Sequence, residues 1–180
     1  MCANTRGFVV AWLKTVAAEG PLEAVLGTDP ELFDHVRGVV ATFWTERLVD
    51  PTVLELCRLR IAALVRCDAE LRLRYQPAID AGLDEDKIRE LPRHYDSDRF
   101  TEFERACLAF TEQFVIDAHG IDDEMFERVS SALSPEAMAA FVSALAYCEG
   151  IARMKLMLGI EPPDEITVVP CPEPARGTLY

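Results

Sequence analysis

Apolar residues recur every three or four positions along most of this chain, which is the spacing of helices packed on a shared core. The clearest case begins at Thr101 and Glu104, a T-x-x-E pair that is typical of a helix start, and runs toward His119. Nearly every segment has this helical periodicity rather than the alternation of a strand. The pattern therefore predicts an all-α fold.

Capping residues divide the chain into helices. Asp29-Pro30 and Asp50-Pro51 each place a capping side chain before a proline, which suits the first helical position. We expect a helical bundle built around one antiparallel helix pair, Pro51–Val65 and Asp68–Ala81. The proline-rich tail from Glu161 is expected to be an extended arm or disordered. Helices are predicted over residues 6–18, 21–26, 30–45, 51–65, 68–81, 85–91, 101–119, 122–132 and 135–158.

Composition narrows the class of protein. The chain has 180 residues, enough for one domain, and a formal net charge of −13, which disfavours nucleic acid as a partner. No apolar run reaches the length of a membrane span, and no cleavage-site pattern follows the first apolar stretch. The six cysteines form no CxxC pair, so we interpret them as reduced thiols of a cytoplasmic protein.

Four pieces of sequence carry a resemblance to a known family. They are Leu48–Leu64, with its Asp50-Pro51 and Arg60-Ile61-Ala62-Ala63-Leu64; Cys67–Leu83; Phe103–Phe110; and Tyr147–Pro163, with Glu149-Gly150-Ile151-Ala152-Arg153. In this order and spacing they resemble the carboxymuconolactone decarboxylase family, which includes alkyl hydroperoxidase D (AhpD). The resemblance implies an AhpD-like helical fold and a homo-oligomer, whether dimer, trimer or hexamer. We assign residues 1–47 to N-terminal packing or interface helices, 48–163 to the family-like domain, and 164–180 to the tail.

The peroxidase branch of that family uses a glutamate, a CxxC pair and a histidine. Glu55 matches the glutamate and Cys67 matches the first cysteine. Glu70 stands in the place of the second cysteine and Arg74 in the place of the histidine, so the CxxC motif is degenerate. A second, decarboxylase-like branch also has a glutamate where this chain has Glu70.

These residues favour acid/base chemistry without a cofactor or metal. Glu55 or Glu70 is a candidate base, and Arg74 is a candidate clamp for a carboxylate or enolate. Tyr75 and Tyr147 are candidate substrate contacts and proton carriers. The resulting hypothesis is a lyase or isomerase acting on a small carboxylated or carbonyl metabolite.

Two other functions stay open from the sequence alone. Cys67 is a candidate attacking thiol for an AhpD-like hydroperoxidase. The second alternative is that the chain is a catalytically inactive, oligomeric interaction protein. In that case Glu70 and Arg74 form a helix-surface ion pair, and Glu55 is buried against an arginine. His94 is expected to lie exposed in a loop.

Geometry sets a condition on every enzymatic hypothesis. On one unbroken helix, Glu55 and Arg74 would lie roughly 28 Å apart. They share a site only if the chain folds back between Val65 and Asp68. We expect a break there, with Asp68 capping the second helix and Cys67 just outside its first turn.

Overall fold

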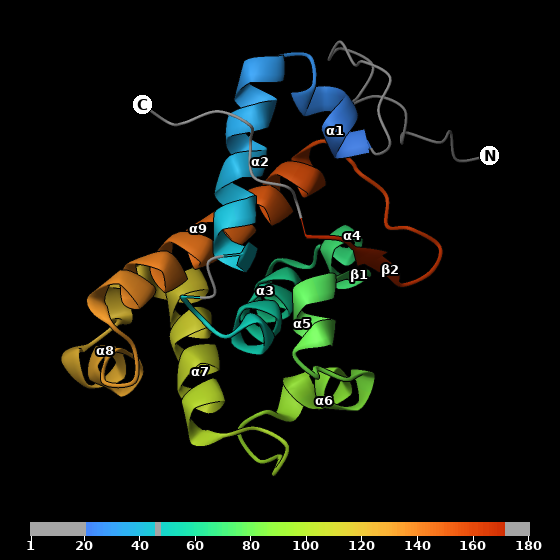
Figure 1. The fold of residues 1–180 in the computed structure, drawn as a ribbon. Helices are drawn as coiled ribbons and strands as arrows, with labels where there is room; N and C mark the ends of the chain where they lie inside the picture. Colours follow the sequence, from blue (N-terminus) through green and yellow to red (C-terminus); the bar gives the residue numbers. More distant parts are fainter. Residues whose placement is uncertain (1–20, 46–47, 172–180) are drawn as a thin grey trace.

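The computed structural model describes residues 21–45 and 48–171, so the helix expected over residues 6–18 lies outside the described part. Within it the all-α prediction is confirmed (Figure 1). The elements are α1 (Pro21–Leu26), α2 (Pro30–Thr45), α3 (Pro51–Val65), α4 (Asp68–Leu71), β1 (Leu73–Tyr75), α5 (Gln76–Asp80), α6 (Glu85–Glu90), the 3₁₀ turn Leu91–Arg93, α7 (Glu102–Asp117), the 3₁₀ turn Ala118–Gly120, α8 (Asp123–Ser130), α9 (Pro135–Met157) and β2 (Thr167–Val169).

Helix α3 lies at the centre of the bundle. It packs against α7 and α9 and also contacts α4 and α5 (Figure 1). Leu56 and Ile61 are fully buried, and so is Glu55, which shows that nearly all sides of the helix are covered. A helix that is covered on nearly all sides is expected in such a central position.

Helix starts were predicted accurately because they depend on local hydrogen bonds. The Asp29 carboxylate accepts from the Leu32 amide at 3.1 Å. The Asp50 carboxylate accepts from the Thr52 amide at 2.7 Å. Thr101 and Glu104 form a complete capping box at the start of α7.

The predicted second helix of the antiparallel pair is wrong as a continuous element. After α4 the chain leaves the helical conformation at Arg72, forms β1, and turns into α5. Pro77 explains the break, because in a helix over residues 68–81 its ring would meet the carbonyl of Leu73 and it would lack an amide donor. The pair is therefore α3 packed against two short helices with a strand between them.

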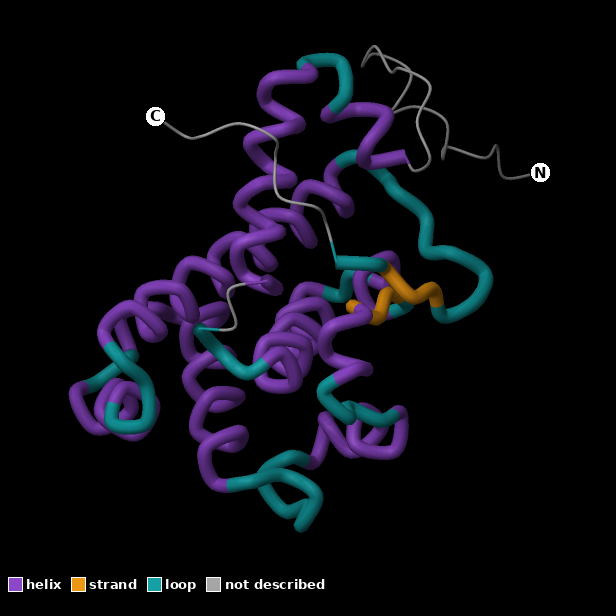
Figure 2. Tube along the Cα trace, viewed as in Figure 1, coloured by secondary structure: helices purple, strands orange, loops and turns teal. Residues whose placement is uncertain are grey.

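The segment after α9 is extended, and part of it is a strand. Thr167–Val169 pairs in parallel with Leu73–Tyr75, forming the two short strands in Figure 2. The Thr167 amide also donates to the Arg72 carbonyl at 2.8 Å. The tail thus holds the strand that interrupts the second helix.

Among the described residues, α9 alone is long and apolar enough to cross a membrane, by length and composition only. A core helix of a soluble protein meets the same criteria. Helix α9 packs against α3 and buries Phe141 and Leu145, which is the role of a core helix.

Candidate active site

A left-handed turn brings the two halves of the site together. Arg66 ends α3 with φ 60° and ψ 44°, and the Cys67 amide donates back to the Ala62 carbonyl at 2.8 Å. This arrangement closes a helix end with a residue other than the usual glycine. The predicted break between residues 65 and 68 is confirmed. Cys67 caps α4 and Asp68 is its first residue, so the expected cap was misplaced by one position.

Arg58 is the centre of the buried polar structure. Its Nε and Nη2 atoms donate to the two Glu55 carboxylate oxygens at 2.8 and 2.7 Å. Nη1 donates to the Glu70 carboxylate at 2.6 Å and to the Glu70 carbonyl at 2.9 Å. Nη2 also donates to the Leu73 carbonyl at 2.8 Å. A guanidinium has five N–H groups, so every donor is used.

Lys155, from α9, completes a network of four charges. Its ammonium nitrogen lies 2.5 Å from the second Glu70 oxygen. Burial raises the pKa of Glu70, but the attraction of Arg58 and Lys155 outweighs it and leaves the pKa below its usual value. Two carboxylates and two cations leave the network with no net charge, which is what allows it to be buried.

Glu55 also fixes the strand. Its carboxylate accepts from the Tyr75 amide at 3.2 Å. Glu55 is fully buried and Glu70 is 4% exposed, so both predicted acids lie inside the protein. The structure therefore brings Glu55 and Glu70 together, but through Arg58 rather than around an open space.

Arg74 does not join this network. Its Nε and Nη2 atoms bind the two carboxylate oxygens of Glu85 at 2.7 and 3.1 Å, and Nη1 binds the carbonyls of Leu71 and Leu73. The Glu70–Arg74 ion pair was therefore a wrong prediction. The helix that would have placed the two residues four positions apart on one face ends at Leu71.

Cys67 is buried in a small apolar cluster. It is 1% exposed and packs with Ala69, Ala152, Val65 and Ile160. Burial, followed by the charge of Glu70, raises the pKa of its thiol despite the opposing effect of Lys155. Such a thiol stays protonated near neutral pH, which is unfavourable for attack on a peroxide.

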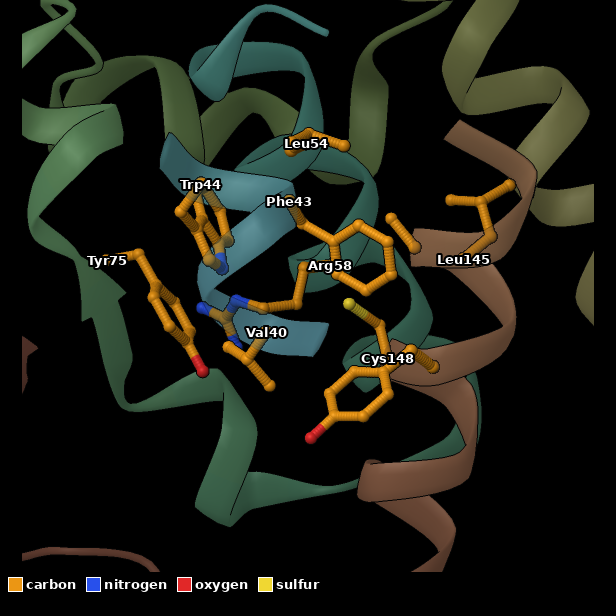
Figure 3. Close-up of a pocket in the computed structure, with 10 residues that line it drawn as sticks. Val40, Phe43, Trp44, Leu54, Arg58, Tyr75, Leu145 and Cys148 are labelled. Atoms are coloured by element: carbon orange, nitrogen blue, oxygen red, sulfur yellow. The ribbon is translucent and has the colours of Figure 1, made fainter. Parts of the chain in front are cut away.

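A small cavity lies beside Arg58. It has a volume of about 20 Å³, room for roughly one water molecule. Figure 3 shows Trp44 and Tyr75 on one side of Arg58 and Cys148 on the other. The lining comes from α2, α3, β1 and α9 and consists of Val40, Phe43, Trp44, Leu54, Arg58, Tyr75, Ala144, Leu145, Tyr147 and Cys148.

Aromatic rings form much of the wall. Trp44 and Tyr75 are stacked with ring centroids 4.5 Å apart and planes 9° apart. The Arg58 guanidinium carbon lies 5.2 Å from the Tyr75 ring centroid, within range of a cation–π contact. The cavity thus has flat apolar walls and one cation whose hydrogen-bond donors all point elsewhere.

Three side chains on the cavity can carry a proton. Burial, and the nearby charge of Glu70, raise the pKa of both Tyr75 and Tyr147, so both phenols remain protonated. Burial likewise raises the pKa of the Cys148 thiol to about 12. Within the described part of the chain, neither phenol oxygen has a hydrogen-bond partner.

Sequence reasoning identified Tyr75 and Tyr147 but missed Arg58, Lys155 and Cys148. Arg58 follows Glu55 by three positions in an apolar helix, and that spacing was a usable sign of a buried pair. Lys155 and Cys148 come from α9, far along the chain, and no local pattern connects them with α3. Among the described residues, no three metal-binding side chains of the His, Cys, Asp or Glu type cluster together.

A second polar cluster lies on the other side of α3. Arg60 is two residues after Arg58, about half a turn around the helix, and its Nε donates to Glu112 of α7 at 2.6 Å. Tyr95 donates to the same carboxylate. His94, expected to be exposed, is fully buried, and its Nδ1 lies 3.0 Å from the Leu91 carbonyl. Its Nε2, 3.7 Å from Glu112, has no hydrogen-bond partner among the described residues.

Comparison with known proteins supports the family resemblance. The sequence model of the carboxymuconolactone decarboxylase family matches residues 30–113. That range includes Glu55, Arg58, Glu70 and Tyr75, whereas Tyr147, Cys148 and Lys155 lie beyond it. A comparison with curated protein sequences gave no match.

Two solved structures share the fold. One is a protein of unknown function from Agrobacterium tumefaciens whose description proposes an antioxidant defence protein AhpD. It is 22% identical, with a TM-score of 0.64, over 77% of this chain and 95% of that one.

The other is the debrominase Bmp8, both in its apo form and as a cysteine-to-alanine variant bound to 2,3,4-tribromopyrrole. It is 19% identical, with a TM-score of 0.65, over 81% of this chain and 78% of that one. At these identities the likeness shows the fold alone. Residues 30–113 of this chain, just under half of it, therefore match the model of the carboxymuconolactone decarboxylase family, and the described part of the chain shares the helical fold of these two structures.

Proposed function

We propose that this protein is a cofactor-free lyase that decarboxylates a small acid with a carbonyl group β to its carboxylate. The observation that carries the proposal is the cavity beside Arg58. Tyr75 and Tyr147 line the site with protonated phenols that have no hydrogen-bond partner among the described residues, and the charged side chain in the described lining is the cation Arg58. Such a site stabilises negative charge that develops on a carbonyl oxygen.

The bond changes follow from that arrangement. The bond between the α carbon and the carboxylate breaks, and CO₂ leaves. The electron pair forms a carbon–carbon double bond, and the carbonyl electrons move to oxygen, which accepts hydrogen bonds from Tyr75 and Tyr147. The positive face of Arg58 lowers the energy of this enolate. A proton from solvent at the α carbon then restores the ketone.

Decarboxylation fits the cavity better than isomerisation does. An isomerase needs a base that touches the substrate, and in the described part of the chain no carboxylate lines the cavity. Glu55 and Glu70, the bases expected from the sequence, bind Arg58 instead. In this proposal they are positioning residues that hold the guanidinium. The apolar wall formed by Val40, Leu54 and Leu145 disfavours a buried carboxylate and so favours its loss as neutral CO₂.

The substrate enters by movement of the part of the cavity wall that α2 supplies. A cavity of about 20 Å³ is too small for an organic acid. Helix α2 buries only Ala41 and Trp44, so it is held by fewer contacts than α3 or α9. A wall with few buried contacts opens at low cost in free energy.

One alternative has a specific observation in its favour. All five Arg58 donors are used and the cavity is small, as expected of a catalytically inactive interaction protein that kept the fold. For a hydroperoxidase that uses Cys67, the buried thiol with its raised pKa offers no comparable support.

The assembly and the compartment are also part of the proposal. Helix α2 exposes Leu32 and Val39, which suits a contact between copies of the chain in a homo-oligomer. The five described cysteines form no disulfide, which suits the cytoplasm.

The test is the release of CO₂ from a panel of 3-oxo acids, followed by ¹³C NMR against the spontaneous rate. The proposal expects acceleration of at least one acid by the wild type and by Cys67→Ser, because that thiol lies off the cavity. No acceleration for any acid would favour the inactive protein. Loss of the rate in Cys67→Ser would overturn the assignment of the cavity.

A further inference from the structure

A second cavity extends outward from the first. It has a volume of about 200 Å³ and is lined by Thr42, Phe43, Leu48, Val49, Leu54, Ala139, Ala140 and Ser143. Phe43 and Leu54 line both cavities, so their side chains separate the two spaces. We propose that both cavities form one binding site, for a ligand with a carbonyl head and an uncharged apolar tail of several carbon atoms.

The lining defines the chemistry of the tail. Among the described residues, no charged side chain lines the second cavity, and the polar side-chain groups in its lining are the hydroxyls of Thr42 and Ser143. The Thr42 hydroxyl already donates to the Gly38 carbonyl at 3.0 Å, which leaves Ser143 as the one other polar side chain. A charged or strongly polar tail would lose its hydration here without gaining partners.

The position of the second cavity gives the direction of entry. Thr42, Leu48, Ala139 and Ser143 are exposed, whereas Leu54 is buried. The cavity therefore opens at the surface and ends inside at the partition. The head passes inward to Tyr75 and Tyr147, and the tail stays behind in the outer space.

Phe43 is the movable part of the partition. Leu54 belongs to the central helix α3, where packing holds it, but Phe43 is half-buried on α2. Its ring centroid lies 5.9 Å from that of Tyr147. Rotation of this one side chain joins the two spaces, which provides the volume that the inner cavity lacks. Phe43 is thus the residue that sets the size of the bound ligand.

The inference rests on the proposed function for the chemistry of the head but not for binding. Neutral methyl ketones bind without losing CO₂, so they test the site whether or not the protein is a decarboxylase. We would titrate the full chain with 2-butanone and 2-heptanone by calorimetry. The expected result is a gain in affinity of about fourfold for each added methylene. Equal affinity for the two ketones would overturn the inference while leaving the proposed decarboxylation intact.

Two alanines of α9 supply a matched pair of variants. Ala140→Phe fills the outer cavity, whereas Ala146 is exposed on the same helix and does not line it. Ala140→Phe is expected to remove most of the gain in affinity of 2-heptanone over 2-butanone, whereas Ala146→Phe is expected to keep it. Phe43→Leu, a mild change, is expected to strengthen the binding of 2-heptanone.

Two results would contradict this. One is an equal loss of affinity for both ketones in Ala140→Phe. The other is a change in the sedimentation mass of Ala140→Phe with no change in ketone preference, which would make the outer cavity a contact with a second copy of the chain.

Discussion

Two arginines, two positions apart on α3, anchor polar clusters of opposite character. Arg58 is 3% exposed and binds two buried carboxylates and two carbonyls through all its donors. The Arg60 side chain is 19% exposed and is paired with one carboxylate, Glu112. The first cluster is closed and neutral, and it adjoins a cavity. The second is partly exposed to solvent and contains an imidazole nitrogen that has no hydrogen-bond partner among the described residues. The candidate site therefore lies on the side of α3 where the charges are buried and fully paired. The number of charges does not distinguish the two sides.

The largest expected effect comes from breaking one cluster at a time. Arg58→Met leaves Glu55 and Glu70 buried near a single cation, which should lower the free energy of unfolding by about 3–5 kcal/mol. Arg60→Met breaks one partly buried pair, whose side chains are 19% and 12% exposed, and should cost less, about 1–3 kcal/mol. Urea denaturation of both variants measures the difference. Equal losses would show that the two clusters do not differ as described.

Acid should affect the Arg58 cluster through Glu70. Its pKa is lower in the folded protein than in the unfolded chain, so its contribution to stability is complete above the unfolded value of about 4.3. That contribution is lost as the pH falls through the lower, folded value. Glu70→Gln should cost about 2 kcal/mol at neutral pH and should flatten this acid dependence. Denaturation midpoints measured from about pH 6 to 3 give the test, with Glu112→Gln as the matched change at Arg60. An acid dependence unchanged in Glu70→Gln would contradict the assignment.

The tail strand should stabilise only the Arg58 side. Thr167→Pro removes the amide that donates to Arg72 and should cost about 1 kcal/mol. Amide hydrogen exchange at Leu73 and Tyr75 should accelerate, whereas exchange in α7 should not. Thr167→Val keeps the amide and serves as the control. Equal acceleration in α7 would mean that the strand supports the whole fold.

The smallest expected effect concerns the turn that folds α4 toward α3. Arg66 adopts a left-handed conformation that costs a residue with a side chain about 1 kcal/mol. Arg66→Gly should therefore raise the free energy of unfolding by up to about 1 kcal/mol, and Arg66→Ala should not. A thermal melt of the three proteins resolves the order. Destabilisation by glycine would mean that the arginine side chain contributes more than the strain removes.

The sequence predicted what depends on neighbours in the chain and missed what depends on distant ones. The helix starts at Asp29, Asp50 and Thr101 were right because a capping side chain acts within three residues. The break near Arg66 was predicted from the need to bring Arg74 to Glu55; the break is present, but Arg74 binds Glu85 instead. Pro77 was a local sign that was overlooked, and with it the end of the second helix.

The remaining errors have a different physical origin. The pairing of β1 with β2 joins residues more than 90 positions apart. A strand of three residues is too short for its periodicity to predict such a pairing. His94 looked exposed because its neighbours are polar, but Tyr95 and Phe100 pack on its ring. The cavity is lined by residues of α2, α3, β1 and α9. Their arrangement in space could not be predicted from the sequence alone.

The central claim is that the phenols of Tyr75 and Tyr147, in the cavity beside Arg58, polarise the carbonyl group of the substrate. The most direct measurement compares Tyr147→Phe with Tyr95→Phe, because Tyr147 lines the cavity and Tyr95 binds Glu112 on the other side of α3. With the most reactive 3-oxo acid, Tyr147→Phe should lower the catalysed rate of CO₂ release by about 10²–10³-fold. Tyr95→Phe should leave it unchanged. Equal rates in both variants and the wild type would contradict the account.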